Sequence, residues 1–249
     1  MLQRHFYLAF ERLMTTLKLR LLKRQQRTGE AAGFERDTVP PPRTTTDPRL
    51  SSPDGALIAD GAIPRHDADT MGQMIPEPSP WSFREKFIRT IWMLLGRPLF
   101  RLSSHNWYGF RAWLPRVFGG KIGRGTRIRP SVHVEIPWTL DIRDGVTVGD
   151  HAILYGLGTI TIGERTIVSQ YAHLCAGTHD HTDRRFPLIR DPIDIGPDAW
   201  IGADAFVGPN VRIGRLCVLG ARSSAYKDLD PATVYVGNPA KALKSRELR

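Results

Sequence analysis

An aliphatic residue recurs every six positions through the second half of the chain, and this period restricts the possible folds more than any other feature. In the longest unbroken run the recurring residues are Ile195, Ile201, Val207, Ile213 and Leu219, and a glycine follows each of them. An α-helix repeats its buried stripe about every 3.6 residues, and a β-strand repeats its buried face every two. A period of six therefore fits neither element and indicates a different architecture.

The same spacing relates three earlier groups of residues. These groups are Ile122, Ile128, Val134 and Leu140; Ile142, Val148 and Leu154; and Ile162, Val168 and Leu174. Three faces of six residues close one coil, and stacked coils bury the aliphatic positions inside a parallel β-solenoid. Glycine or another small residue beside each inward position permits the tight corners. The spacing predicts five coils, at 122–139, 142–159, 162–179, 195–212 and 213–230.

The repeat is interrupted between the third and fourth coils, at residues 180–194. Insertions in a solenoid emerge as loops and often carry the functional site. His179 ends the third coil beside this insertion, and the alternation along a strand turns its side chain outward. Because an outward imidazole can accept a proton from a hydroxyl near neutral pH, His179 is the candidate general base, with His181 as a second candidate. His173 lies on another edge, and we expect it to be structural.

Three histidines within nine residues also match the ligand type of a zinc site, as in carbonic anhydrases that share the solenoid architecture. His133 and His173 occupy equivalent positions in their coils, but Ile153 stands between them, so no ladder of histidines forms. We therefore expect no metal. The sequence also contains no G-x-S-x-G nucleophile elbow, no P-loop and no dinucleotide-binding fingerprint.

The chain before the solenoid changes composition twice. Residues 1–27 carry seven Arg or Lys and one acid, with apolar residues every three or four positions, which predicts a basic amphipathic helix. This helix is a candidate membrane-surface anchor, although packing on a partner protein or a start codon upstream of the true one would also explain it. Residues 28–80 hold nine of the 19 prolines, which predicts a disordered linker.

Residues 81–121 contain four of the six tryptophans, interleaved with arginine and lysine. We expect a helical segment whose tryptophans pack on the solenoid while its arginines face water. Contact with a membrane interface is an alternative, and nucleic-acid binding is a weaker one. The solenoid itself is assigned to residues 122–230, and residues 231–249 are predicted to cap its C-terminal end.

The composition is that of an ordinary globular protein, with 41% hydrophobic and 24% charged residues and a formal net charge of +10, which excludes disorder throughout the chain. The two cysteines, Cys175 and Cys217, lie far apart in the sequence. This excludes a disulfide framework and suits a reducing cytoplasm. Since no stretch of 18 or more apolar residues occurs, we expect no transmembrane helix.

Four segments carry sequences more distinctive than the plain repeat. They are IPWTLDI around Trp138, SQYAHLCAGTHD at 169–180, DAWIGADAFVGPNVRIG at 198–214 and YVGNPAKAL at 235–243. Together they resemble the hexapeptide-repeat O-acetyltransferases, and most of all those of colanic acid and other exopolysaccharide biosynthesis. The resemblance extends over about residues 81–244. It implies an all-β fold, a left-handed parallel β-helix of about five coils, which assembles as a homotrimer with active sites between adjacent protomers.

The resemblance also implies an activity. The chain would transfer an acetyl group from acetyl-CoA directly to a hydroxyl of a sugar or exopolysaccharide precursor, in the cytoplasm. The family's catalytic histidine falls on His179, and its neighbour is Asp180. Tyr155 and His181 fall on the acceptor side, although Gly156 stands where relatives often carry an asparagine beside the acceptor sugar.

For acetyl-CoA the resemblance implies a groove on the coils after the insertion. Trp200 and Ala203 would line the pantetheine path, and the backbone of Ala221 would hydrogen-bond to it. Lys227 and Lys244 would meet the phosphates and the adenine end, where cations favour an anionic ligand.

Two other hypotheses about function remain open. One is a non-catalytic β-solenoid that binds or scaffolds other molecules, and the other is a zinc enzyme resembling carbonic anhydrase. Acetyl-CoA, a saccharide acceptor and further copies of the chain are the expected partners, with peripheral membrane contact through the N-terminal basic segments and no nucleic acid.

Overall fold

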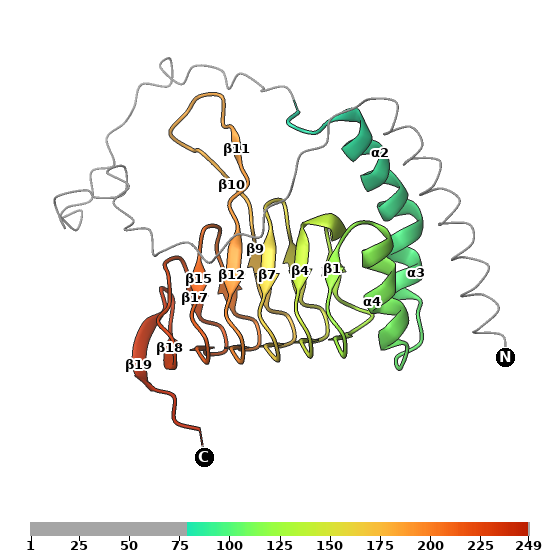
Figure 1. Ribbon diagram of the computed structural model, residues 1–249. Helices are drawn as coiled ribbons and strands as arrows, with labels where there is room; N and C mark the ends of the chain where they lie inside the picture. The colour runs from blue at the N-terminus through green and yellow to red at the C-terminus, as the bar shows by residue number, and fades with distance from the viewer. Residues whose placement is uncertain (1–78, 249) are drawn as a thin grey trace, which may run out of the picture. The chain divides into compact units, whose positions relative to one another are not determined.

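Three parallel sheets, each with one strand from every coil, form a three-sided β-solenoid (Figure 1). This computed structural model describes residues 79–248. The predicted amphipathic helix at 1–27 and nearly all of the predicted linker at 28–80 lie outside the described residues. The first five strands of each sheet in chain order correspond to five coils, so the prediction of a five-coil parallel β-helix is confirmed.

The three faces are named here A, B and C. Face A contains β1 (Lys121–Ile122), β4 (Leu140–Ile142), β7 (Ile160–Ile162), β12 (Ile193–Ile195) and β15 (Arg212–Ile213). Face B contains β2 (Arg127–Ile128), β5 (Thr147–Val148), β8 (Ile167–Val168), β13 (Trp200–Ile201), β16 (Val218–Leu219), β18 (Thr233–Val236) and β19 (Lys241–Ser245). Face C contains β3 (His133–Val134), β6 (Ile153–Tyr155), β9 (His173–Cys175), β14 (Phe206–Val207) and β17 (Ser224–Ala225).

The coils stack in register, so each inward residue lies directly above its equivalent in the next coil. On face C, Leu154 pairs with Leu174, which pairs with Val207, and Val207 pairs with Ala225. These residues are almost completely buried. Each buried leucine or valine contributes about 1.5–3 kcal/mol relative to exposure, which makes this ladder the core of the solenoid.

The corner glycines are required by the same stacking. A Cβ atom at Gly202 would lie 2.6 Å from the backbone nitrogen of Ala221 in the next coil. No side chain fits in that gap, so the sequence keeps glycine next to the inward Ile201. Beyond the fifth coil, β18 pairs with β16 and β19 returns antiparallel to β18. Face B therefore continues into β18 and β19, which lie within the segment 231–249 expected to cap the solenoid.

Four short helical elements precede the first coil and lie along that end of the solenoid in Figure 1. They are α2 (Phe83–Ile91), the π-helical turn η2 (Trp92–Gly96), α3 (Arg97–Arg101) and α4 (Tyr108–Val117), and a 3₁₀ turn η3 (Pro137–Thr139) follows later. Ser82 and Glu85 form a capping box that starts α2. Trp92 is fully buried and its Nε1 donates to the carbonyl oxygen of Val134 at 3.0 Å. The expected packing of tryptophan on the solenoid is therefore confirmed for Trp92.

The expectation that all arginines of this segment face water is wrong for Arg111. Its side chain is 0% exposed, and burial lowers its pKa. Its guanidinium donates to the carbonyl oxygens of Ile128, Ser104 and His105 and to the Ser103 hydroxyl, at 2.5–2.8 Å. A planar group with five donors can satisfy four acceptors at once, so Arg111 fastens α4 to the second strand and to the preceding loop.

A second polar cluster joins α2 and α3 to face C. Glu135 accepts hydrogen bonds from Arg89 and from His133 Nε2, the latter at 2.9 Å, while Arg97 donates to His133 Nδ1 at 2.8 Å. The hydrogen bond from His133, assisted by Arg89, lowers the pKa of Glu135 to about 2 despite its burial. The helical segment is therefore held by paired charges as well as by Trp92.

The insertion forms an antiparallel hairpin, β10 (Thr178–His179) with β11 (Leu188–Ile189), which projects from the solenoid in Figure 1. Arg190 follows β11 directly and lies over the Trp81 ring at 4.9 Å. Arg89 of α2 lies over the same ring at 5.3 Å. The ring of Trp81 thus connects the start of the helical segment to the base of the hairpin by two cation–π contacts.

Replacement of Arg111 tests the buried hydrogen-bond cluster. The Arg111→Ala variant should lose about 2–4 kcal/mol of unfolding free energy, because several acceptors lose their donor in a buried place. Urea unfolding followed by circular dichroism measures this. Arg116→Ala is the matched control on the same helix, since Arg116 is exposed and donates to Ile122 and Gly123. Equal losses of unfolding free energy in the two variants would contradict the special role of the buried Arg111 hydrogen bonds.

Replacement of Trp81 tests the connection to the hairpin. Trp81→Ala should make amide exchange in residues 178–190 about 2–5-fold faster, because two exposed cation–π contacts are lost. Hydrogen–deuterium exchange with mass spectrometry resolves this segment. Trp81→Phe should retain part of the protection, and Trp107→Ala, whose ring contacts Phe110, should leave the hairpin unchanged. Unchanged exchange in Trp81→Ala would show that the hairpin is held by other contacts.

Candidate active site

Each coil passes through faces A, B and C in that order, which gives the solenoid three edges, A–B, B–C and C–A. The hairpin leaves the solenoid after β9 of face C and returns at β12 of face A. His179 therefore lies on the C–A edge, at the root of the hairpin, and its side chain is exposed as the sequence predicts.

The imidazole of His179 is held by Phe186 on the opposite arm of the hairpin. His179 Nδ1 lies 2.8 Å from the carbonyl oxygen of Phe186, and the two rings stack with centroids 4.4 Å apart and planes 11° apart. A carbonyl oxygen can only accept a hydrogen bond, so Nδ1 carries the proton. The lone pair of the neutral ring is then on Nε2, which is the arrangement that a general base requires.

Phe186 adopts a left-handed backbone conformation, with φ of 48°. A bulky side chain in this region is unusual and costs about 1–3 kcal/mol. The conformation directs both the ring and the carbonyl group of Phe186 toward His179. Sequence reasoning missed this residue, because a backbone carbonyl leaves no motif.

Asp180 shapes the loop of the hairpin. Its carboxylate accepts hydrogen bonds from the Thr182 backbone and hydroxyl at 2.9 and 2.5 Å, and these bonds lower its pKa. The hydrogen-bond partner of His179 Nδ1 is Phe186 rather than this carboxylate. His181 is exposed in the same loop.

Aromatic rings line face C beside the hairpin. Tyr155 meets the His173 ring edge-on at 6.3 Å, and His173 meets Phe206 at 5.5 Å. The Nε2 atom of His173 is buried without a hydrogen-bond partner, and burial followed by the nearby His133 lowers the pKa of His173. A neutral, packed ring fits the structural role expected for His173.

Gly156 follows Tyr155 at the C–A edge and leaves no space for a larger residue. A Cβ atom there would lie 2.5 Å from Thr139 Oγ1, and that hydroxyl donates to the Gly156 carbonyl oxygen at 2.8 Å. The departure from the family pattern at this position therefore has a local cause, and an asparagine would displace Thr139.

The residues expected to bind acetyl-CoA lie on other parts of the solenoid. Trp200 points outward from face B; the residue is 47% exposed, and its Nε1 donates to Ser169 Oγ at 2.9 Å. Ala203 and Ala221 lie one coil apart on the B–C edge, and Lys244 lies in β19. Within one chain these residues are therefore not brought to the edge that carries His179.

Lys227 is the exception among the expected cofactor residues. It follows β17 of face C, which places it on the same C–A edge as His179, two coils further along. Its side chain is exposed. Of the two lysines expected at the CoA groove, Lys227 thus lies on the edge that carries His179, and Lys244 lies on face B.

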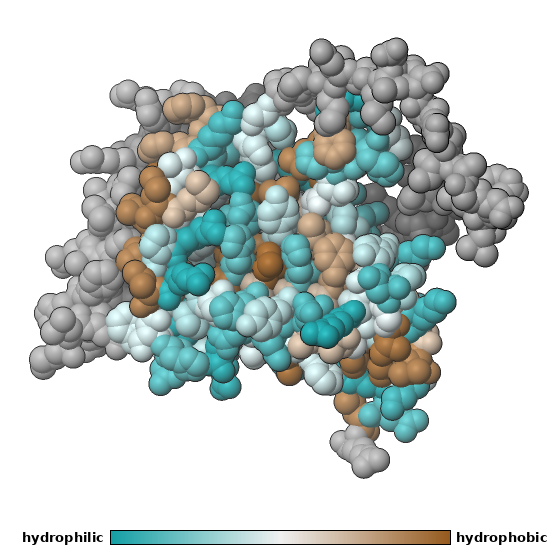
Figure 2. Space-filling model, turned by 180° about the vertical axis from the view of Figure 1, so that it is seen from behind, coloured by the Kyte–Doolittle hydropathy of each residue, from teal (hydrophilic) through white to brown (hydrophobic). Residues whose placement is uncertain are grey.

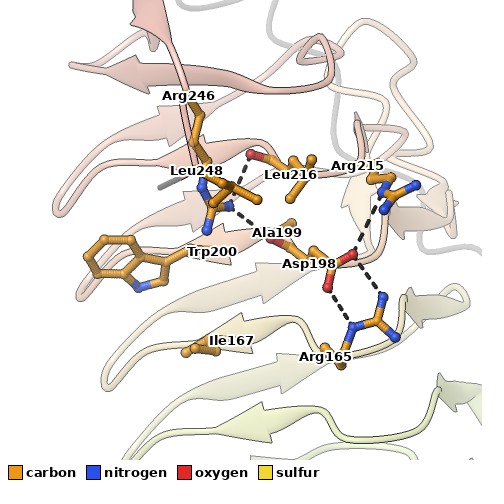
Figure 3. A pocket seen from close by; sticks show the side chains of 9 residues that line it. All are labelled: Arg165, Ile167, Asp198, Ala199, Trp200, Arg215, Leu216, Arg246 and Leu248. Carbon is orange, nitrogen blue, oxygen red and sulfur yellow. Dashed lines mark hydrogen bonds and ion pairs between the residues drawn. The ribbon is translucent and has the colours of Figure 1, made fainter.

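A pocket at the A–B edge is shown in Figure 3. It is lined by Arg165, Ile167, Asp198, Ala199, Trp200, Arg215, Leu216, Arg246 and Leu248. Arg165 and Arg215 both point at the Asp198 carboxylate, and Arg165 lowers the pKa of Asp198. Arg246 donates to the carbonyl oxygens of Asp198 and Leu216. The Asp198 carboxylate of the pocket is thus paired with two arginines, and Arg246 is bonded to backbone carbonyl oxygens.

Within residues 79–248 no group of three or more His, Cys, Asp or Glu side chains is arranged to hold a metal ion. In the same range no helix is long and apolar enough to cross a membrane.

Comparison with known proteins relates this geometry to a family. The family model described as bacterial transferase hexapeptide (six repeats) matches residues 192–224. The Escherichia coli (strain K12) protein WcaF, whose name describes a colanic acid biosynthesis acetyltransferase, is 44% identical over 156 residues. These residues make up 63% of this chain and 86% of WcaF.

Solved structures agree with this relationship. The hexapeptide-repeat containing acetyltransferase of Vibrio cholerae is 26% identical, with a TM-score of 0.62, and the match covers 67% of this chain and 94% of that one. A second structure from Vibrio cholerae, of the O1 biovar eltor and complexed with acetyl coenzyme A, has a TM-score of 0.54 at 24% identity, covering 69% and 93% of the two chains.

The extended match to WcaF, together with the five-coil solenoid and the hairpin that carries His179, identifies the chain. The match to WcaF favours an acetyltransferase over a non-catalytic scaffold or a zinc enzyme. The chain belongs to the hexapeptide-repeat bacterial transferases and is an acetyltransferase.

Proposed function

We propose that this enzyme transfers an acetyl group from acetyl-CoA directly to a hydroxyl of a sugar or exopolysaccharide precursor, with His179 as the general base. The observation that carries the proposal is the hydrogen bond between His179 Nδ1 and the Phe186 carbonyl oxygen, which leaves Nε2 free as an acceptor. The WcaF relative, named for colanic acid biosynthesis, supports a saccharide acceptor.

The chemical step needs one group that accepts and returns a proton. Nε2 of His179 takes the proton of the acceptor hydroxyl as its oxygen bonds to the acetyl carbonyl carbon. Acetyl-CoA supplies the thioester, whose carbon–sulfur bond breaks in the same exchange. The proton on Nε2 then passes to the departing sulfur. The Phe186 carbonyl stabilises the transient imidazolium, because Nδ1 keeps its hydrogen bond throughout.

The donor groove is proposed on the coils after the hairpin. Trp200 and Ala203 line the pantetheine path, the backbone of Ala221 hydrogen-bonds to it, and Lys227 and Lys244 meet the anionic end. The exposed indole of Trp200 and the exposed lysines support these roles, since CoA carries both an apolar arm and phosphates. The acetyl coenzyme A complex from Vibrio cholerae supports the donor.

A homotrimer is proposed because the parts of the site lie on different edges of one chain. His179 lies on the C–A edge, whereas Ala203 and Ala221 lie on the B–C edge. When three prisms pack around a three-fold axis, one edge of each can face a different edge of its neighbour. The groove between two protomers then unites His179 of one chain with the donor residues of the next.

The proposed location is the cytoplasm, where the acetyl-CoA donor is available. The basic N-terminal segments hold the enzyme near the inner face of the membrane, which the positive charge of residues 1–27 and 81–121 supports. Tyr155 and His181 are proposed on the acceptor side of the groove, and Asp180 is proposed to act on His179 through the shape of its loop.

Replacement of His179 tests the general base. His179→Ala should lower kcat by about 10²–10⁴-fold, which corresponds to about 3–5 kcal/mol of barrier. Acetyl-CoA affinity, measured by titration calorimetry, should stay within about twofold because the donor groove lies on other coils. Thioester loss in the presence of a panel of saccharides measures the rate.

Two further histidine variants serve as controls. His181→Ala should keep kcat within about tenfold, and His173→Ala should alter unfolding free energy more than turnover, because its ring is packed. Loss of turnover in His181→Ala with normal turnover in His179→Ala would show that His181, and not His179, is the general base. Normal turnover in both would refute base-assisted direct transfer at this hairpin.

The oligomeric state is open to a direct measurement. Light scattering coupled to size-exclusion chromatography should give three times the mass of one chain at micromolar concentration, because one chain alone does not complete the groove. A fully active monomer would refute the composite site.

A further inference from the structure

The outer side of the helical segment exposes a row of large apolar side chains. This row, named here the outer helix face, consists of Phe83, Phe87, Leu94, Leu95 and Leu102. Phe83 is 86% exposed and Leu102 is 84% exposed. Figure 2 shows apolar surface gathered along the edge of the molecule where the helices lie. A contiguous exposed apolar patch of this kind marks an interaction surface.

The inner side of the same helices already has its partner. Trp92, Gly96 and Phe100 are buried, and Trp92 packs on Phe100 and Phe118. A surface helix normally has one apolar stripe, which covers the core, and a polar opposite side. Here the outer side also carries large apolar residues, and the packing of residues 79–248 does not explain the outer helix face.

The charges around this face restrict its partner. Residues 83–102 contain five Arg or Lys and one acid, Glu85. The carboxylate of Glu85 caps α2 by accepting from the Ser82 backbone and hydroxyl at 2.8 and 2.7 Å. Arg89 and Arg97 are engaged with Glu135, whereas Lys86 and Arg101 are exposed. The rim of the apolar row is therefore cationic.

We propose that the outer helix face docks on an anionic lipid bilayer. The phenylalanines and leucines enter the boundary between headgroups and acyl chains, and Lys86 and Arg101 lie among the anionic headgroups. A second copy of the chain fits less well, since two such faces would bring like charges together. The inference refines the membrane contact of the proposed function and does not depend on acetyl transfer.

Vesicle flotation of the full chain tests the docking. The wild-type protein should bind vesicles that contain phosphatidylglycerol at least about tenfold more strongly than vesicles of phosphatidylcholine alone. The double variant Phe83→Ser/Leu94→Ser should lose about tenfold or more of that binding, because two inserted side chains are removed. Lys86→Glu/Arg101→Glu should lose the preference for anionic lipid.

The matched control replaces exposed leucines elsewhere. Leu243→Ser/Leu248→Ser changes two leucines that are 61% and 65% exposed near the C-terminus, and it should bind vesicles like the wild type. Wild-type binding by Phe83→Ser/Leu94→Ser, or equal binding to both vesicle types, would overturn the proposal. A change of oligomeric state in Phe83→Ser/Leu94→Ser would also overturn it and assign the face to contact between copies.

Acetyl-CoA turnover by the same variants separates this inference from the proposed function. The outer helix face variants should retain the turnover of the wild type in detergent-free solution without vesicles. Absent turnover in every variant and in the wild type, with vesicle binding as expected, would refute the proposed reaction alone.

Discussion

In-register stacking of structurally equivalent coils is the constraint on which the other features depend. Each strand pairs with its equivalent in the coils before and after it, so the backbone hydrogen bonds run along the solenoid while the aliphatic ladders fill its interior. Close approach of successive coils, as at Gly202 and Ala221, leaves little tolerance for change at the corners. Departures from the repeat must therefore project outward at an edge, and the long insertion does so as the hairpin of β10 and β11.

That hairpin carries the proposed catalytic residue. Its second arm supplies the carbonyl oxygen of Phe186, which fixes the tautomer of His179, and the two stacked rings hold the imidazole in place. The rigid solenoid beneath fixes the root of the hairpin, while Trp81 joins its base to the helical segment through Arg190 and Arg89. The regular solenoid thus fixes the position of the hairpin, and the hairpin orients the imidazole that the proposed function requires.

The sequence predicts the fold well because the six-residue period records the stacking directly. It also locates His179 at the start of the long insertion between the third and fourth coils, where the structure has it as an exposed residue of the hairpin. Features that depend on backbone atoms or on distant partners are not accessible in this way. The Phe186 carbonyl, the buried donors of Arg111 and the Trp81 contact each join residues through the fold, without a local pattern. The division of the expected site residues between two edges likewise becomes visible only when the coils are stacked.

A mixed-chain complementation assay tests the composite groove most directly. Ala203→Trp blocks the proposed pantetheine path and His179→Ala removes the base, so each variant alone should be nearly inactive. If each site takes His179 from one protomer and Ala203 from its neighbour, random mixed trimers should recover about a quarter of wild-type activity, because about one interface in four combines two intact halves. Activity that stays at the level of the separate variants would contradict the account, since it would place both halves of the site in one chain.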